Sequence, residues 1–504
     1  MIKSFFKHSV WLGLVGAALV LTLLIHSPAM PRARYAHAKD VAPTAPATPL
    51  HYTNLKFPPL PAIQIPKYDR YQLENGLVVY LMQDRQLPLV RGTALFRTGS
   101  RLEPANKVGL ADITGTTMRT GGTLTHSADE LNKLLEQRAA AIETSMGTSS
   151  GSASFDTLSK DTETVFQLFA DVIQNPAFTV DKIDLAKNQL KGAIARRNDD
   201  PDDIASREFS KLIYGATSPY ARTIEYSTLN AISRDDIVNF HQTYIRPDTT
   251  ILGIVGDFEL EPMKALVSQY FGNWQVNTPK PDLPVPTANQ KQTEAAFLVD
   301  QPQLTQSNIL LGHLGGKLNS PDYPALSVMN GVLNGFGGRL FNNIRSKQGL
   351  AYSVYGSWNA GYDYPGLFIA GGQTRTDTTI PFVQSLLKEI ERIRTTSVTP
   401  EELAYAKESI LNSFVFKFEN PSQTLTRLMT YEYYDYPPSF IFDYQKQVKA
   451  TKAEDVQRVA NQYLQPDKIL TLIVGNGKVI QPNLKDLGEK VQTIDITIPD
   501  PPKS

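Results

Sequence analysis

Two periodicities of hydrophobic residues divide this chain into strands and helices. From Tyr71 apolar and polar positions alternate, and the alternation continues through residues 77–81, as in a half-buried strand. Residues 251–255 and 469–474 are continuous apolar runs instead, and they predict strands buried on both faces.

Helices are predicted where apolar residues recur every three or four positions. Leucines within residues 129–136 form such a stripe, and Ser127 followed by Glu130 predicts a capping box at its start. A second helix is predicted over residues 165–173, and Thr399 followed by proline opens a third. Because strands follow strands and helices occur in runs, we expect an α+β fold.

The sequence also repeats itself. Residues 233–256 match residues 452–475 at an offset of 219, with Tyr-x-x-Pro-Asp in both copies. An earlier pair, residues 185–187 and 405–407, matches at an offset of 220. Two matches at nearly one offset indicate duplication of a domain of about 200 residues.

Proline-rich segments suggest where the domains begin and end. Residues 39–66 are rich in Pro, Ala and Thr, which predicts an extended linker, and a second proline-rich break spans residues 278–286. The predicted parts after the linker are an N-terminal domain, an interdomain linker, a C-terminal domain and a tail, at residues 67–277, 278–296, 297–480 and 481–504.

The N-terminus has the layout of a secretory signal. Lys3 and Lys7 precede an apolar run over residues 10–25, and Ala-His-Ala follows at 36–38. We therefore expect residues 1–38 to direct export to the periplasm or the extracellular space, with an uncleaved membrane anchor as the alternative. Without this segment the chain has 46 basic and 50 acidic side chains, a net charge of −4, so nucleic-acid binding is not expected. The chain has no cysteine, which excludes disulfides and thiolate metal sites.

Residues 109–118 have the frame of a metalloprotease helix without the side chains that use the metal. In the inverted zinc motif H-x-x-E-H, two histidines on one helical face bind zinc and the glutamate polarises the attacking water. Here the first histidine position holds Asp112, the glutamate position holds Gly115, and the second histidine position holds Thr116.

The sequence around this segment resembles the pitrilysin/insulinase family of zinc peptidases. Residues 73–77 and 99–103 precede it in the family's pattern, Gly-Gly-Thr at 121–123 follows, and the resemblance covers residues 67–480. It implies two homologous domains, each a mainly antiparallel sheet packed with helices. It also implies a third zinc ligand, a glutamate on a later helix, at the position that Gly192 holds here.

A carboxylate at Asp112, a hydroxyl at Thr116 and two glycines cannot form a zinc site. We therefore expect no metal or other cofactor in this chain, and no peptidase activity from it alone.

His126, His241 and His313 are not expected to be metal ligands. His126 lies near Asp129 and Glu130, but acids in the first turn of a helix are favoured by its dipole regardless of any metal. His241 falls in an amphipathic helix, where a packed or solvated side chain is expected. His313 follows an apolar run and is predicted to be an ordinary strand residue.

The second half keeps a more specific pattern. Residues 337–355 resemble the C-terminal motif of the family, in which an arginine and a tyrosine seven residues on reach the zinc site. Arg345 and Tyr352 match that pair in identity and spacing, and Gly349 is expected to end the helix between them. The alternative is that Arg345 is a surface ion-pair partner and Tyr352 a strand aromatic.

The resemblance predicts a division of labour. Some bacterial members of the family resemble half-enzymes that pair as heterodimers, one chain carrying H-x-x-E-H and its partner the Arg/Tyr pair. We expect this chain to be the partner with the Arg/Tyr pair. It would be a substrate-binding subunit that binds peptides, while a homologous partner holds zinc. The alternative is a non-enzymatic peptide-binding or scaffold protein.

Three other motifs have simpler readings. Ser149 fits G-x-S-x-G, but the alternating residues after it predict a turn between strands rather than a nucleophile elbow. Residues 335–339 lack the pattern of a phosphate loop and are expected to let a backbone pass close to its neighbour. The tyrosines of residues 431–438 are expected to pack at a corner between helices, with a recognition surface as the alternative.

Overall fold

The computed structural model describes residues 63–292, 295–480, 484–487 and 491–500. The predicted signal segment lies outside these residues, as does the predicted linker up to residue 62. Among the described residues, no helix has both the length and the apolar character needed to cross a membrane.

The first half forms a six-stranded mixed sheet in the order β1-β2-β6-β3-β5-β4. The neighbours β2 and β6 are parallel and the other neighbouring pairs are antiparallel. Every residue of β6 is buried, as the continuous apolar run predicted. The strands are β1 (Asp69–Gln72), β2 (Val78–Gln83), β3 (Leu89–Phe96), β4 (Ala141–Met146), β5 (Gly151–Leu158) and β6 (Thr250–Gly256).

The second half forms a sheet of the same design in the order β12-β7-β11-β8-β10-β9. Its last five strands repeat the order and the directions of β2-β6-β3-β5-β4, so the predicted duplication and the α+β fold are confirmed. The strands are β7 (Ala295–Asp300), β8 (Gln306–Leu314), β9 (Ser353–Asn359), β10 (Leu367–Arg375), β11 (Leu470–Gly475) and β12 (Val491–Thr493).

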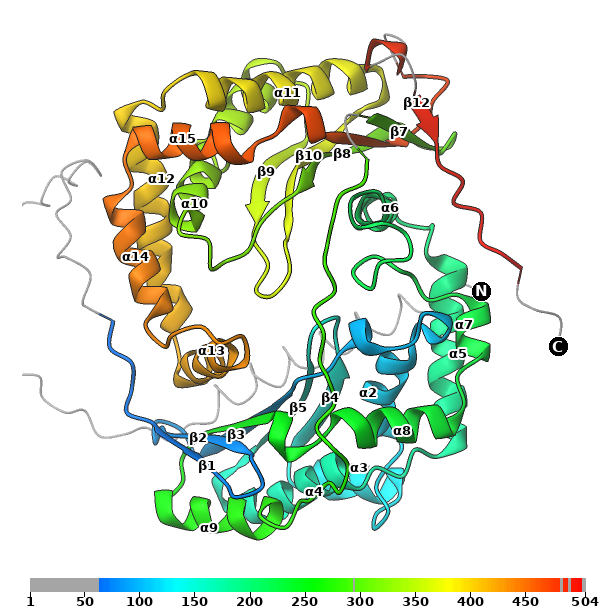
Figure 1. Ribbon diagram of the computed structural model, residues 1–504, viewed down its shortest axis with the longest axis vertical. Coiled ribbons are helices and arrows are strands. Elements are labelled where there is room, and N and C mark those ends of the chain that lie inside the picture. Colours follow the sequence, from blue (N-terminus) through cyan, green and yellow to red (C-terminus); the bar gives the residue numbers. More distant parts are fainter. Residues whose placement is uncertain (1–62, 293–294, 481–483, 488–490, 501–504) are drawn as a thin grey trace, which may run out of the picture. The chain divides into compact units, whose positions relative to one another are not determined.

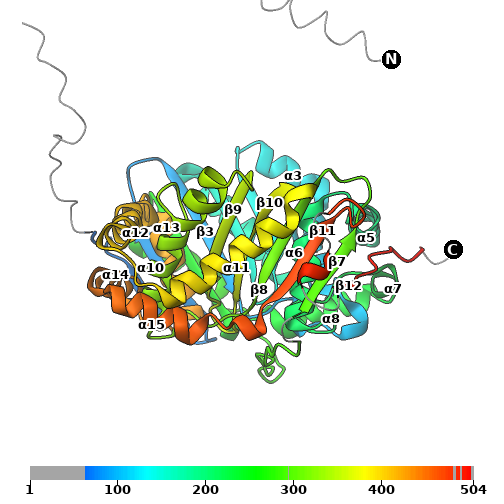
Figure 2. The same cartoon turned by 90° about the horizontal axis from the view of Figure 1, so that it is seen from above.

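Helices cover both sheets (Figure 1), and each half has its own apolar core. The first half contains α2 (Leu110–Thr120), α3 (Ala128–Glu136), α4 (Thr162–Gln174), α5 (Val180–Arg196), α6 (Pro201–Tyr214), α7 (Tyr226–Asn230), α8 (Arg234–Tyr244) and α9 (Leu260–Phe271). The second half contains α10 (Tyr323–Leu333), α11 (Thr379–Thr395), α12 (Pro400–Ser413), α13 (Pro421–Tyr433), α14 (Phe440–Ala450) and α15 (Ala453–Tyr463). Figure 2 shows α11 lying across β8 and β10 with α15 beside it.

The local signals in the sequence place helix starts correctly. Ser127 and Glu130 form the predicted capping box at the start of α3. Thr399 caps α12, with Pro400 as its first residue and Glu402 completing a second capping box. The predicted helix over residues 165–173 is the central part of α4.

The repeat extends to single hydrogen bonds. The bounds of α8 and α15 differ by the predicted offset of 219. Lys187 Nζ donates to the carbonyl of Ile232 at 2.5 Å, and its counterpart Lys407 donates to the carbonyl of Thr451 at 2.9 Å. In the first half, a lysine of α5 therefore bonds the residue two positions before α8. In the second half, the corresponding lysine of α12 bonds the residue two positions before α15.

The halves exchange one helix each. Helix α6 packs on β8 and β11 of the second sheet, with Phe209 and Ile213 in a shared apolar cluster. Helix α13, the counterpart of α6 at an offset of 220, packs on β6 of the first sheet through Leu425 and Met429. Each sheet is thus covered partly by a helix from the other half (Figure 1).

The segments expected to be linker and tail also take part in the fold. Strand β12 lies within residues 481–504 and pairs in parallel with β7, and Ile494 and Ile496 pack beside α6. At the other end, Ile63 and Ile65 pack against buried clusters.

Candidate functional site

Helix α2 begins at a left-handed glycine and a buried carboxylate. Gly109 has φ of 106°, and Glu103, 4% exposed, accepts hydrogen bonds from the N–H groups of Gly109 at 3.2 Å and Ala111 at 2.9 Å. Burial raises the pKa of Glu103, and Arg222 lies 3.8 Å from its carboxylate. These contacts fix where α2 starts and therefore the direction in which its side chains point.

The family resemblance places metal-site residues at three positions of α2. Asp112 lies on the exposed side of the helix, where nearby protein removes enough water to raise the pKa of its carboxyl. Thr116 is partly exposed, one turn further on. Gly115 is buried against β4: a Cβ there would lie 2.7 Å from the Met146 nitrogen, and Thr144 Oγ1 donates to the Gly115 carbonyl at 2.6 Å. A glutamate at this position would require β4 to move.

The fourth position has the opposite surroundings. Gly192 lies on the exposed side of α5, and a Cβ there would meet no atom within 4 Å. The residues at the four positions therefore do not fit zinc, because one carboxylate and one hydroxyl cannot supply the three ligands of a catalytic site. Within the described residues no three His, Asp or Glu side chains gather as a metal-binding group.

His241, His313 and His126 each contact neighbouring protein atoms. His241 is buried, pairs with the Ile173 carbonyl at 2.8 Å through Nε2, and has its pKa lowered to about 4 by burial. His313, in β8, accepts from the Gln465 N–H at 3.2 Å, and burial lowers its pKa. His126 contacts Thr125 in a turn.

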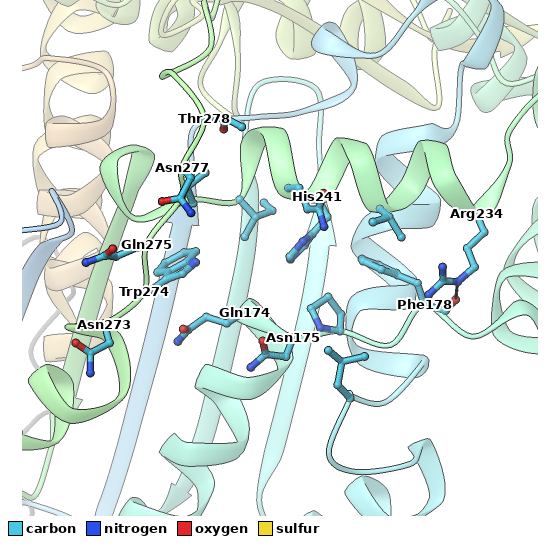
Figure 3. A pocket seen from close by; sticks show the side chains of 16 residues that line it. Gln174, Asn175, Phe178, Arg234, His241, Asn273, Trp274, Gln275, Asn277 and Thr278 are labelled. Atoms are coloured by element: carbon cyan, nitrogen blue, oxygen red, sulfur yellow. Dashed lines mark hydrogen bonds between the residues drawn. The ribbon is translucent and has the colours of Figure 1, made fainter.

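A pocket of about 690 Å³ lies beside His241 (Figure 3). Amide side chains and apolar side chains line it in similar numbers, and its one arginine, Arg234, already donates to the carbonyls of Phe178 and Ala177. None of its lining residues comes from α2, α5 or the segment that carries Arg345 and Tyr352, so it is separate from the predicted site.

The structure brings Arg345 and Tyr352 together. Arg345 lies in the π-helical segment η6 (Phe341–Lys347). Gly349, two residues beyond its end, has φ of 64° and donates its N–H to the Arg345 carbonyl. The Arg345 guanidinium carbon lies 5.8 Å from the centre of the Tyr352 ring. Tyr352 lies one residue before β9 rather than within it, and its N–H already donates to the Gln373 carbonyl.

This pair is part of an exposed row that the sequence did not reveal. The Arg345 guanidinium also lies 5.0 Å from the Phe341 ring, which packs edge-on against Phe336 at 5.0 Å. Phe336 and Tyr352 are 81% and 74% exposed. We call Phe336, Phe341, Arg345 and Tyr352 the aromatic row. Its signal in the sequence was an apolar residue set within a run of glycines.

The glycine loop at residues 335–338 is anchored beside the aromatic row. Tyr405 accepts from the Gly337 N–H at 3.3 Å, and a Cβ on Gly337 would lie 2.8 Å from the Tyr405 ring. The backbone of the loop therefore passes close to its neighbours, the Tyr405 ring at Gly337 and the Asn334 backbone at Gly338. Buried Arg339 forms two hydrogen bonds to the Glu402 carboxylate, at 2.8 and 2.7 Å.

The other motifs have the structural roles predicted for them. Ser149 lies in the turn between β4 and β5, with no helix after it, so the nucleophile-elbow geometry is absent. In the tyrosine cluster, Tyr431 and Tyr436 are buried and pack against Phe440 at the corner between α13 and α14. Tyr433, also buried, packs on the first sheet instead.

Comparisons with known proteins give a consistent result. Residues 79–225 match the family described as Insulinase (Peptidase family M16), and residues 231–410 match the family described as Peptidase M16 inactive domain. The chain is 24% identical over 417 residues to the uncharacterized zinc protease YmxG of Bacillus subtilis, covering 81% of this chain and 99% of that protein.

Solved structures show the same fold. A peptidase M16 inactive domain from Pseudomonas fluorescens superposes with a TM-score of 0.74 at 23% identity, covering 83% of this chain and all of that one. The periplasmic protease PqqL from Escherichia coli superposes with a TM-score of 0.70 at 15% identity, covering 87% of this chain and 49% of that one.

Proposed function

Because this chain belongs to the insulinase (M16) family of peptidases, we propose that it is the substrate-binding subunit of a heterodimeric zinc peptidase. A homologous partner with an intact H-x-x-E-H motif holds the zinc and cleaves the peptide. This chain contributes Arg345 and Tyr352 to the site. Residues 1–38 direct this chain out of the cytoplasm.

The observation that carries the proposal is the exposure of Arg345 and Tyr352. Within the described residues the Arg345 guanidinium contacts two aromatic rings rather than a carboxylate. A guanidinium and a phenol can both donate to a peptide carbonyl that develops negative charge under attack.

The four degenerate positions support the same division of labour. Gly115 lies where the resemblance places the glutamate that polarises water, and β4 fills the space of its side chain. A chain built in this way needs another subunit for hydrolysis.

The first test is association. The exported chain should co-purify with an exported H-x-x-E-H relative from the same cell, and cell fractionation should find both outside the cytoplasm. A chain that stays monomeric with every such relative contradicts the proposal.

The second test is catalytic. We expect the double variant Arg345→Ala, Tyr352→Phe to lower kcat/KM of the complex by more than about tenfold, because two donors to the scissile carbonyl are lost. Lys347→Ala, on the same helical segment, is the matched control and should leave kcat/KM unchanged. An unchanged value in the double variant rules out the assigned role.

A peptide-binding or scaffold protein without a catalytic partner is the second candidate. The exposed Phe336 at one end of the aromatic row favours it, because large exposed apolar side chains in a group mark interaction surfaces. Under this alternative the double variant weakens peptide binding and no zinc-bearing relative is recovered.

A further inference from the structure

The pocket beside His241 is formed by segments of the first half that are far apart in the sequence (Figure 3). The end of α4 contributes Gln174 and Asn175, α8 contributes His241 and Gln242, and the segment after α9 contributes Trp274. Figure 3 shows Gln174 and Asn175 opposite α8, with Trp274 to one side. The volume of about 690 Å³ falls within the roughly 300–1,000 Å³ of small-molecule sites.

This pocket offers little to a charged ligand. No Asp, Glu or Lys is among its described lining residues, so a cation would find no carboxylate. The guanidinium of Arg234 donates through Nε and Nη2 to the carbonyls of Phe178 and Ala177, and an anion would have to compete with them. His241 is neutral at physiological pH because burial lowers its pKa to about 4. A charged group would therefore lose its water here without gaining a free counter-ion.

The buried His241 presents a hydrogen-bond acceptor to the pocket. Its Nε2 pairs with the Ile173 carbonyl at 2.8 Å, so the neutral ring has its proton on Nε2 and an acceptor at Nδ1. Among the described residues Nδ1 has no partner, and it is not one of the fully enclosed unpaired atoms. Because His241 lines the pocket, Nδ1 is accessible to a ligand hydroxyl group there.

Amide side chains add donors and acceptors around His241. Gln174 donates to the Tyr270 carbonyl at 2.9 Å, and Asn175 donates to the Asp171 carboxylate at 2.9 Å. Both amides are thus held in place, and their oxygens have no partner among the described residues. Four further amides that line the pocket are exposed, and each has two N–H donors and an acceptor oxygen: Gln242, Asn273, Gln275 and Asn277.

Apolar side chains form the rest of the lining, among them Val238, Ile245 and Trp274. A purely apolar ligand would cover the amides and leave them without hydrogen bonds, which costs about 1–3 kcal/mol for each buried group. A sugar ring meets both requirements, because its hydroxyl groups donate and accept while its C–H faces are apolar. The lining therefore matches an uncharged ligand that is rich in hydroxyl groups.

We propose that this pocket is a carbohydrate site for an uncharged saccharide. Sugar hydroxyl groups bond the Asn and Gln amides and His241 Nδ1, and a C–H face lies against the apolar lining. The inference goes beyond the proposed function, since this ligand is not the peptide that is cleaved. None of the lining residues belongs to the aromatic row, so a bound saccharide leaves Arg345 and Tyr352 free.

The test is isothermal titration calorimetry of the full chain with sugar trimers. Maltotriose and chitotriose are the uncharged probes, and trigalacturonate and the glucosamine trimer carry negative and positive charges on similar rings. We expect at least one uncharged trimer to bind at least about tenfold more tightly than both charged trimers, because an unpaired charge is costly to desolvate. An acetylated and amidated tri-alanine peptide is the non-sugar probe and should bind at least about tenfold more weakly than that trimer.

A pair of double variants locates the binding. Asn175→Ala with Gln242→Ala removes two lining amides and should weaken binding of the uncharged trimer about tenfold, as expected for two lost hydrogen bonds. Gln167→Ala with Asn239→Ala removes two exposed amides of α4 and α8 outside the lining and should leave the affinity unchanged. Thermal unfolding reports whether each variant folds. Asn273→Ala with Asn277→Ala, after α9, should act like the first pair.

The absence of binding by both uncharged trimers overturns the carbohydrate site. So does equal binding of a charged trimer or of the tri-alanine peptide, and so does an affinity that survives both lining variants. The proposed function is judged separately by kcat/KM of the complex with Arg345→Ala and Tyr352→Phe, so either can fail while the other stands.

Discussion

Gly115 and Gly192 stand where the family resemblance places two glutamates, and their surroundings are opposite. A side chain on Gly115 meets the backbone of β4, whereas a side chain on Gly192 points into open space. Alanine is a better helix former than glycine by up to about 1 kcal/mol, so in a helix with free space the exchange stabilises.

We therefore predict opposite effects for one substitution at the two sites. Gly115→Ala should lower the free energy of unfolding by about 1–3 kcal/mol, because its methyl group overpacks against β4. Gly192→Ala should raise it by up to about 1 kcal/mol. Urea denaturation of both variants measures this difference. Effects of equal sign would mean that the contact between α2 and β4 is looser than described.

The buried His241 gives a pH dependence whose sign can be worked out. Burial lowers its pKa from 6.5 to about 4, so between these values the unfolded chain binds a proton that the folded chain does not. The contribution of His241 to the free energy of unfolding is fully present above pH 6.5. It is lost as the pH falls toward 4, and the loss is on the order of 3 kcal/mol.

His241→Gln keeps an N–H for the Ile173 carbonyl and removes the titration. We expect its free energy of unfolding to fall less than that of the parent between neutral pH and the folded-state pKa. Urea denaturation across that range is the measurement, and parallel profiles for parent and variant would contradict the assignment.

At the scale of residues, the sequence identifies residue pairs that are defined by identity and spacing. It does not identify contacts that form only when helices and strands pack together. Arg345 and Tyr352 could be chosen because an identity and a spacing survive in the chain. The contact of Gly115 with β4 joins residues about 30 positions apart through tertiary structure, and no local pattern records it. The sequence shows Phe336 as one apolar residue in a glycine loop, and its edge-on contact with the Phe341 ring is apparent only in the structure.

At the scale of elements, the C-terminal segment acts as a clamp between the halves. The Ile494 N–H donates to the Leu298 carbonyl, and Asn198 of the first half donates to the Ile496 carbonyl at 2.7 Å. Ile494 and Ile496 pack beside α6, while Ile498 packs against the core of the first half.

Removing residues 491–504 should therefore destabilise the whole fold. Three part-buried isoleucines at about 1 kcal/mol each suggest a loss of roughly 3 kcal/mol. Removing residues 501–504 alone is the control and should leave the melting temperature unchanged. Calorimetry of the two truncations measures the difference, and equal melting temperatures would show that β12 contributes little.

Helices whose starts carry capping residues could be predicted from the sequence. The exchange of α6 and α13 between the two halves could not. Capping residues such as Ser127 and Thr399 act within one turn, so the sequence alone places them. Helices α6 and α13 have amphipathic sequences that do not say which sheet they cover. Their shared signal, a capping Asp200 or Asn420 followed by proline at an offset of 220, marks them as a pair but not as an exchange.

For the whole molecule, the degenerate site sets an expectation about metal. Purified alone, the chain should contain no stoichiometric zinc and show no chelator-sensitive turnover, because its four positions supply one carboxylate and one hydroxyl. Inductively coupled plasma mass spectrometry measures the zinc.

The double variant Asp112→His, Thr116→His is a sharper probe. It restores two ligands on one face of α2 and should bind zinc weakly without turnover, since the water-polarising glutamate is still missing. Stoichiometric zinc with turnover in the parent chain would overturn the division of labour between subunits.

The exchange of α6 and α13 has a consequence for how such a molecule can be assembled. If the two repeats were made as separate polypeptides, each would leave an apolar sheet face bare until it met the other, and the encounter would depend on concentration. Fusion into one chain makes that meeting intramolecular and concentration-independent. A dimer of identical ancestral subunits that exchanged one helix each would give this arrangement after fusion of the two gene copies.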